Sequence, residues 1–276
     1  MQNYKDLVSN ILLNGESRKD RTGTGTLNIF APAELRFDLA KEFPLLNLRK
    51  VSFHSILTET LWFLSGKCYH TKYLQKHRVT IWDEWANNGY LGNIYGVQWR
   101  NWQGRYVIEE GHTEYYDQIA DLIHNLQSNP TSRRHIVSAW NVAEINEMAL
   151  PPCHWGFQCY VSNGNKLSLK LFLRSSDVYL GLPYNIAGYA IICHILANIC
   201  GLQVGKLIIN LGDAHLYKNH LQQANEILQR ETLQLPTFEI TKKLCLNDLD
   251  SLEPDKDLFK LSNYISHSRL DAPISI

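Results

Sequence analysis

An apolar run over residues 186–199 constrains the fold of this chain more than any other feature. Gly188 and His194 interrupt the run, which is shorter than the roughly 20 apolar residues that cross a bilayer. It is followed by Gly201, and glycine commonly terminates a helix. We therefore expect a helix in the core of a cytoplasmic protein, covered by other elements of the fold.

Strand patterns occur on both sides of this helix. Residues 155–161 and 166–173 alternate around Asn163-Gly164, which predicts a β-hairpin. Strands and helices then alternate along the chain, which predicts an α/β or α+β fold with a mixed sheet covered by helices. The other expected strands lie at residues 27–39, 135–140 and 206–211, and the other expected helices at 1–13, 52–64, 116–127 and 212–229.

The composition indicates one folded domain without a strong overall charge. With 276 residues and 45% hydrophobic content, the chain can bury a large core, and no stretch reads as a linker, so we expect a single domain over residues 1–276. Lys plus Arg and Asp plus Glu both number 27, so no global field attracts nucleic acid and a phosphate requires a local cluster. The six cysteines include no C-x-x-C pair, which predicts reduced thiols and no metal site.

Cys153 has the most reactive surroundings of the six cysteines. It follows Leu150-Pro151-Pro152, and Arg174 comes at the end of the second hairpin strand. A thiolate is a good carbon nucleophile, and it forms at neutral pH only where positive charge or hydrogen-bond donors hold it. A buried, inert thiol is the alternative. A cysteine hydrolase that uses His154 as base is disfavoured, because adjacent strand residues point to opposite faces.

The segment 80–102 holds an unusual density of aromatic residues. Four tryptophans and two tyrosines lie among three glycines, which suits a site for a flat, ring-shaped ligand. For any single ring, packing against the edge of the core is the alternative. The aromatic residues are Trp82, Trp85, Trp99, Trp102, Tyr90 and Tyr95.

Seven short blocks occur along the chain in a distinctive order. They are Arg21-Thr22-Gly23-Thr24-Gly25, Trp82-Asp83-Glu84-Trp85, Ser132-Arg133-Arg134, Pro152-Cys153-His154, Arg174-Ser175-x-Asp177, Leu182-Pro183-x-Asn185 and Gly212-Asp213-x-His215-x-Tyr217. In this order the blocks resemble the thymidylate synthase family over nearly the whole chain. The resemblance implies that family's fold, with a largely antiparallel sheet through which two copies form an obligate homodimer.

The resemblance also implies reductive methylation of dUMP at C5 with 5,10-methylenetetrahydrofolate, giving dTMP and dihydrofolate. The chemistry agrees, because uracil C5 becomes nucleophilic only after a thiolate adds at C6 and a donor near O4 holds the developing charge. By resemblance, Cys153 is the nucleophile and Asn185 reads the base. Glu59, whose pKa burial would raise, moves protons near O4, and Tyr95 assists removal of the C5 proton. By resemblance, Arg174 is also a catalytic residue.

Ligand contacts follow from the resemblance as well. The phosphate of dUMP is expected to be held by Arg21, Arg174 and Ser175 of one subunit and by Arg133 and Arg134 of the other, since guanidinium groups match a phosphate dianion. His215 and Tyr217 bind the sugar 3′-hydroxyl, and Asp177 is expected at both ligands. The expected folate contacts are Ile81, Trp82, Trp85, Leu150, Asp177, Leu180, Gly181, Tyr184 and, in the covering segment 272–276, Ser275.

Three positions depart from the family pattern. Leu173 replaces a common glutamine, Trp155-Gly156 replaces a small-then-aromatic pair, and Ser52 replaces a common histidine. A dUMP hydroxymethylase, in which water captures the intermediate instead of hydride, therefore stays open. A dCMP-acting member is less favoured, because Asn185 suits uracil whereas that class carries aspartate. A silent nucleotide- or RNA-binding homologue, with Arg133-Arg134 as its footprint, is opposed by the zero net charge.

Overall fold

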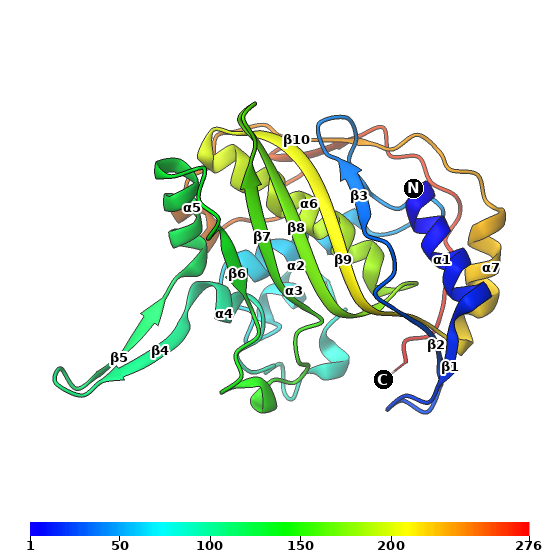
Figure 1. Cartoon of the computed structure of the whole chain (residues 1–276), viewed down its shortest axis with the longest axis horizontal. Coiled ribbons are helices and arrows are strands. Elements are labelled where there is room, and N and C mark those ends of the chain that lie inside the picture. The colour runs from blue at the N-terminus through cyan, green and yellow to red at the C-terminus, as the bar shows by residue number, and fades with distance from the viewer. Residues whose placement is uncertain (276) are drawn as a thin grey trace.

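The computed structural model describes residues 1–275, and a seven-stranded sheet forms the centre of that part of the chain. Its strands run in the order β1-β2-β9-β8-β7-β6, with β3 also paired to β9. Every pair is antiparallel except β8 with β9, the two long strands side by side in Figure 1. The strands are β1 (Glu16–Arg18), β2 (Thr26–Phe30), β3 (Leu35–Asp38), β6 (Ile136–Ser138), β7 (His154–Val161), β8 (Lys166–Asp177) and β9 (Gln203–Tyr217).

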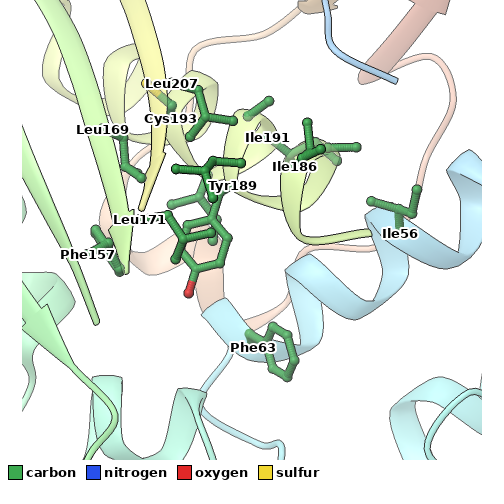
Figure 2. Close-up of a cluster of buried hydrophobic side chains, with 14 of the residues drawn as sticks. Ile56, Phe63, Phe157, Leu169, Leu171, Ile186, Tyr189, Ile191, Cys193 and Leu207 are labelled. Atoms are coloured by element: carbon green, nitrogen blue, oxygen red, sulfur yellow. The ribbon is translucent and has the colours of Figure 1, made fainter. Parts of the chain in front are cut away.

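Helix α6 (Gly181–Cys200) connects β8 to β9. Two parallel neighbours require such a crossover, because a tight turn cannot return the chain in the same direction. Gly201 ends the helix in the left-handed conformation, with φ of 71°. By length and hydropathy α6 could cross a membrane, but 78% of its apolar window is buried inside the protein, as in a core helix. Figure 2 shows this core, in which α6 supplies Ile186, Tyr189, Ile191 and Cys193, and the strands supply Phe157, Leu169, Leu171 and Leu207.

The remaining helices surround this centre. Figure 1 shows α2 (Phe53–Leu64) and α6 on one face of the sheet. Ser52 caps α2, because its side chain accepts a hydrogen bond from Ser55 N at 3.2 Å. The other elements are α1 (Gln2–Asn14), α3 (Lys72–Lys76), η1 (Asp83–Trp85), α4 (Gly96–Arg100), α5 (Gln118–Ser128), η2 (Ile145–Glu147), η3 (Lys218–His220), α7 (Leu221–Gln229), η4 (Leu246–Asp250), the pair β10 (Thr237–Ile240) and β11 (Phe259–Ser262), and the projecting hairpin β4 (Trp102–Val107) and β5 (His112–Tyr116).

Large apolar side chains of β6 and β7 are exposed on the sheet. Ile136 is 54% exposed and Tyr160 is 65% exposed. Trp155 stacks on Phe172, with ring centroids 5.3 Å apart and planes inclined by 30°. Several exposed apolar side chains on neighbouring strands are typical of a surface that associates with another protein surface.

The predicted fold class is confirmed, since helices cover a mixed and largely antiparallel sheet. The hairpin at β7 and β8 and the core helix are also confirmed, although α6 begins earlier than the apolar run, at Gly181.

Two predictions of secondary structure are wrong. The helix expected over residues 212–229 begins only near Leu221, because residues 213–217 continue β9: β2 pairs with all of them, and β8 pairs with residues 213–215 on the other side. Ala214 and Leu216, two residues apart as on one face of a strand, are fully buried. The strand expected over residues 27–39 is divided into β2 and β3 around Ala31, whose φ is 51°.

Candidate active site

A cavity of about 850 Å³ lies where the end of β8 meets the first turns of α6. Helix α2, the end of β9 and the segment 269–275 supply the other walls. Every site residue expected from the sequence lines this cavity except Arg133 and Arg134. They are Arg21, Glu59, Ile81, Trp82, Trp85, Tyr95, Leu150, Cys153, Arg174, Ser175, Asp177, Leu180, Gly181, Tyr184, Asn185, His215, Tyr217 and Ser275.

Cys153 lies immediately before β7, beside the guanidinium group of Arg174. Arg174 donates from Nε to Pro152 O and from Nη2 to Pro151 O, both at 2.9 Å. These bonds fix the cation next to the thiol-bearing segment. Burial raises the pKa of the Cys153 thiol, and the positive charges of Arg174 and Arg21 partly offset that effect. The site therefore holds a thiol beside two groups that stabilise its thiolate form.

Tyr95 connects the backbone of Cys153 to a buried aromatic cluster. Its hydroxyl accepts a hydrogen bond from Cys153 N at 3.0 Å, and its ring stacks on His154 at 4.0 Å between centroids. His154 Nδ1 lies 2.8 Å from the Tyr189 hydroxyl, and burial lowers the pKa of His154 to about 3. His154 is therefore a neutral packing partner of Tyr95, which argues against a role as base for Cys153.

The backbone of Tyr95 is also strained. Its φ is 32°, within the region that side-chain-bearing residues rarely adopt, and its side chain is only 2% exposed. Such strain persists where the surroundings determine the position of a residue. Burial raises the pKa of Tyr95 well above its ordinary value, so its hydroxyl is neutral in the free protein.

Glu59 is a half-buried residue of α2 whose carboxyl group is turned into the wall of the cavity. Burial raises its pKa to about 7, against an ordinary value of 4.5, and a hydrogen bond from Trp82 opposes the shift. Trp82 Nε1 donates to Glu59 Oε1 at 2.6 Å. A group of this kind can release and accept protons near neutral pH.

The parallel pairing of β8 and β9 brings the ends of both strands to the cavity. Asp177 lies opposite His215 in the register, so the ends of both strands reach the same wall. His215 Nδ1 lies 3.1 Å from Asp213 Oδ1, which also accepts from Asn28 Nδ2 at 2.7 Å. The bond from His215 lowers the pKa of Asp213. Because the carboxylate only accepts, His215 Nδ1 carries the proton, and in the neutral ring Nε2 is an acceptor.

Asp177 shapes the turn between β8 and α6. Its Oδ1 accepts hydrogen bonds from Tyr179 N at 2.9 Å and Leu180 N at 3.1 Å. This turn places the first residues of α6 at the cavity, including Tyr184 and Asn185. A turn held by side-chain-to-backbone hydrogen bonds thus brings Asn185 to the cavity that Cys153 also lines.

A family model for thymidylate synthase matches residues 2–276. The chain belongs to the thymidylate synthase family. Members of the thymidylate synthase family are methyltransferases that act on dUMP with methylenetetrahydrofolate as co-substrate. Within residues 1–275, no three His, Cys, Asp or Glu side chains gather as metal ligands would.

Arg133 and Arg134 lie away from the cavity of their own chain in this thymidylate synthase family member. Both are exposed at the start of β6. Arg134 lines a separate cavity of about 240 Å³ between α5 and β6.

The aromatic segment 80–102 divides between cavity and core. Trp82, Trp85 and Tyr95 line the cavity, whereas Trp99 is fully buried in the core and Trp102 begins the projecting strand β4. Only part of the segment therefore lies where the expected ring-shaped ligand could bind. Periodicity could not separate the two sets, because the segment is mostly irregular between short helices.

The sequence analysis missed a basic rim formed by Arg49, Lys50 and Arg269. Arg49 is 7% exposed, donates from Nη2 to Tyr179 O at 2.7 Å and lies over the Tyr179 ring at 4.7 Å. The adjacent basic pair just before α2 was the available signal. Charged residues at a helix start are too common to single it out.

The three departures from the family pattern lie in different places. Ser52 lines the cavity and caps α2. Trp155 stacks on Phe172 and does not line the cavity. Leu173 is 2% exposed and is paired with His154 across β7 and β8. Ile276, the last residue of the expected covering segment, lies outside the described residues.

Proposed function

We propose that this protein is a thymidylate synthase that converts dUMP to dTMP with 5,10-methylenetetrahydrofolate as carbon donor and reductant. The observation that carries the proposal is the convergence of Cys153, Glu59 and Asn185 on one cavity that also contains Arg21 and Arg174. A nucleophile, a proton-transfer group, an amide and two cations thus line the same cavity. No simpler binding protein requires this combination.

Cys153 begins the proposed reaction. Its thiolate attacks uracil C6, and the electrons of the C5–C6 double bond move toward O4 as an enolate. Arg174 and Arg21 favour the charged form of the thiol. Asn185 accepts from uracil N3–H and donates to O4, so it both selects the base and stabilises the enolate.

Proton transfer is assigned to Glu59 and Tyr95. Glu59, with a pKa of about 7, exchanges a proton with O4 through water. Tyr95 has a raised pKa, so it acts through its neutral hydroxyl, which orients the acceptor that removes the C5 proton. His215 and Tyr217 bind the sugar hydroxyl, and Ser175 assists the arginines at the phosphate.

The folate half of the cavity is assigned to its apolar and aromatic wall. Stacking surfaces from Trp82, Trp85 and Tyr184 suit the pterin ring. Asp177 accepts from the pterin N–H groups, and the basic rim at Arg49, Lys50 and Arg269 suits the carboxylates of the glutamate moiety. When bound, the folate supplies the one-carbon unit and the hydride. Ile81, Leu150, Leu180, Gly181 and Ser275 complete this wall.

We propose a homodimer formed through the exposed apolar surface of the sheet. Trp155, Tyr160 and Ile136 provide its apolar contacts. Arg133 and Arg134 would then reach the phosphate in the cavity of the partner copy, which explains their distance from the cavity of their own chain. Each copy forms one cytoplasmic domain over residues 1–276, and neither membrane nor nucleic acid is needed for activity.

The test is incubation of the purified protein with dUMP and methylenetetrahydrofolate. Dihydrofolate, followed by absorbance, should form in equal amount with dTMP, identified by mass. Hydroxymethyl-dUMP with tetrahydrofolate would instead identify the dUMP hydroxymethylase. Neither product, with no release of tritium from C5-labelled dUMP, would overturn the assignment of Cys153 to catalysis.

A further inference from the structure

The segment 271–275 is held along η3 and α7 by three polar side chains. Gln223 Nε2 donates to Asp271 O at 3.1 Å, and His220 Nε2 lies 2.7 Å from Pro273 O. Asn219 Nδ2 donates to Ser275 Oγ at 3.2 Å. The contacts fall on alternate residues of the segment, so one edge of it is docked throughout its length.

The same segment forms part of the cavity wall. The carbonyls of Asp271 and Pro273 meet η3 and α7, and Asp271, Ala272, Ile274 and Ser275 line the cavity. The contacts with η3 and α7 therefore hold the apolar residues Ala272 and Ile274 at the site.

His220 is the buried member of this docking set. Its side chain is fully buried, whereas Asn219 and Gln223 take part in exposed contacts. Because a carbonyl oxygen only accepts, His220 Nε2 must donate to Pro273 O. Its Nδ1 is buried without a hydrogen-bond partner in the described part of the chain.

His220 also contacts the wall of the cavity. Its ring lies 5.7 Å from the ring of Tyr217, at 72°, and 5.3 Å from the ring of Tyr179. Tyr217 lines the cavity, and the Tyr179 hydroxyl donates to Leu270 O at 2.8 Å. One buried ring thus lies between a cavity residue and the segment that covers the cavity.

We propose that His220 is a positioning residue that holds residues 271–275 over the folate half of the cavity and links them to Tyr217. The inference rests on the proposed function for the identity of the ligands. Binding of nucleotide against Tyr217 fixes the ring of His220, and the ring fixes Pro273. Nucleotide binding therefore prepares the cover under which hydride transfer excludes water.

His220→Phe is the main variant, because it keeps an aromatic ring and removes the Nε2 donor. Loss of one such hydrogen bond should raise KM for methylenetetrahydrofolate about twofold to tenfold, with KM for dUMP changed less than about twofold. Tritium release from C5-labelled dUMP should exceed dihydrofolate formation, because the first steps occur without a closed cover. The proposal would be overturned if His220→Phe kept the wild-type KM for both ligands and still released one tritium for each dihydrofolate formed.

Two further variants separate positioning from packing. His220→Gln retains an N–H at a similar distance from the backbone and should restore coupling of tritium release to dihydrofolate, whereas His220→Asn, which is shorter, should not. His267→Phe is the matched control, since His267 Nε2 also bonds a backbone carbonyl, Glu231 O at 2.9 Å, and does not line the cavity. An equal defect in the Gln and Asn variants would indicate packing alone.

A measurement that needs no turnover tests the effect of nucleotide binding on residues 270–275 separately from the proposed function. Hydrogen exchange of the amides in residues 270–275 should slow when dUMP binds wild-type protein, and dUMP should have a weaker effect in His220→Phe. If the wild type forms no dTMP but dUMP still protects these amides more in the wild type than in His220→Phe, the proposed function is wrong and the role of His220 is supported. If dUMP binds and protects these amides equally in both proteins, the link is wrong.

Discussion

Trp82 donates from its indole nitrogen to Glu59 Oε1 at 2.6 Å, across the wall of the cavity. The bond joins a residue assigned to the folate side to one assigned to proton transfer. It stabilises the charged carboxylate, whereas burial favours the neutral acid and raises the pKa of Glu59 to about 7. The proton affinity of Glu59 therefore depends on an aromatic neighbour.

Trp82→Phe should raise the pKa of Glu59 further. Loss of a hydrogen bond to the charged form should move the pH limb of kcat/KM that reports Glu59 upward by about one unit. Trp85→Phe is the matched control, because the buried Trp85 Nε1 has no hydrogen-bond partner in residues 1–275. If kcat/KM changed at the same pH in the wild type and in Trp82→Phe, Trp82 would have no effect on the pKa of Glu59.

Glu59→Gln should change how stability depends on pH. The pKa of Glu59 is raised on folding, from 4.5 to about 7, so its favourable contribution is complete below 4.5 and is lost as pH rises through 7. Because of this group, the free energy of unfolding of the wild type should fall by about 3 kcal/mol from about pH 5 to about pH 8. The Glu59→Gln variant should not show this decrease. Urea unfolding of both proteins at the two pH values measures this difference. The assigned pKa would be contradicted if the free energy of unfolding changed with pH by the same amount in both proteins.

Cys153→Ser should abolish turnover and leave dUMP binding largely intact. The serine hydroxyl does not provide the thiolate, so kcat should fall by about 10³-fold or more, whereas Arg21 and Arg174 still hold the phosphate. Steady-state rates and equilibrium binding of dUMP test the two halves. Cys245→Ser, at an exposed cysteine, is the control. Retained turnover in Cys153→Ser would remove the covalent mechanism.

Asn185→Asp should shift preference from dUMP toward dCMP. A carboxyl group can pair with the cytosine amine, whereas a carboxylate opposes uracil O4. The ratio of kcat/KM for the two nucleotides should change by at least about tenfold, the scale of one lost polar contact together with one gained. An unaltered ratio would show that another residue reads the base.

Mixed dimers should reveal the role of Arg133 and Arg134. Cys153→Ser alone and the double variant Arg133→Ala/Arg134→Ala should each have little activity. In a mixture allowed to exchange subunits, about half of the dimers combine one copy of each, and one of their two sites is complete, which predicts recovery of about a quarter of wild-type activity. No recovery after confirmed exchange would confine each site to a single chain.

The sequence determined the elements whose patterns are local. The alternation around Asn163-Gly164 produced the β7–β8 hairpin, and the apolar run ending before Gly201 produced α6, because a chain must bury such segments whatever surrounds them. The ordered motif blocks and the resemblance that they carry also identified many of the residues that line the cavity, because these lie at strand ends and helix starts that the fold brings together, but they did not identify Arg49, Lys50 and Arg269.

Only the tertiary structure decided the features that depend on distant neighbours. Residues 213–217 became strand because β2 pairs with all of them and β8 pairs with residues 213–215 on the other side, and that pairing outweighs local helix signals. Trp99 entered the core while Trp85 lined the cavity, although the two are close in sequence. Glu59 obtained its pKa of about 7, and His220 its contact with Pro273, because burial and packing arise from segments far apart in the chain.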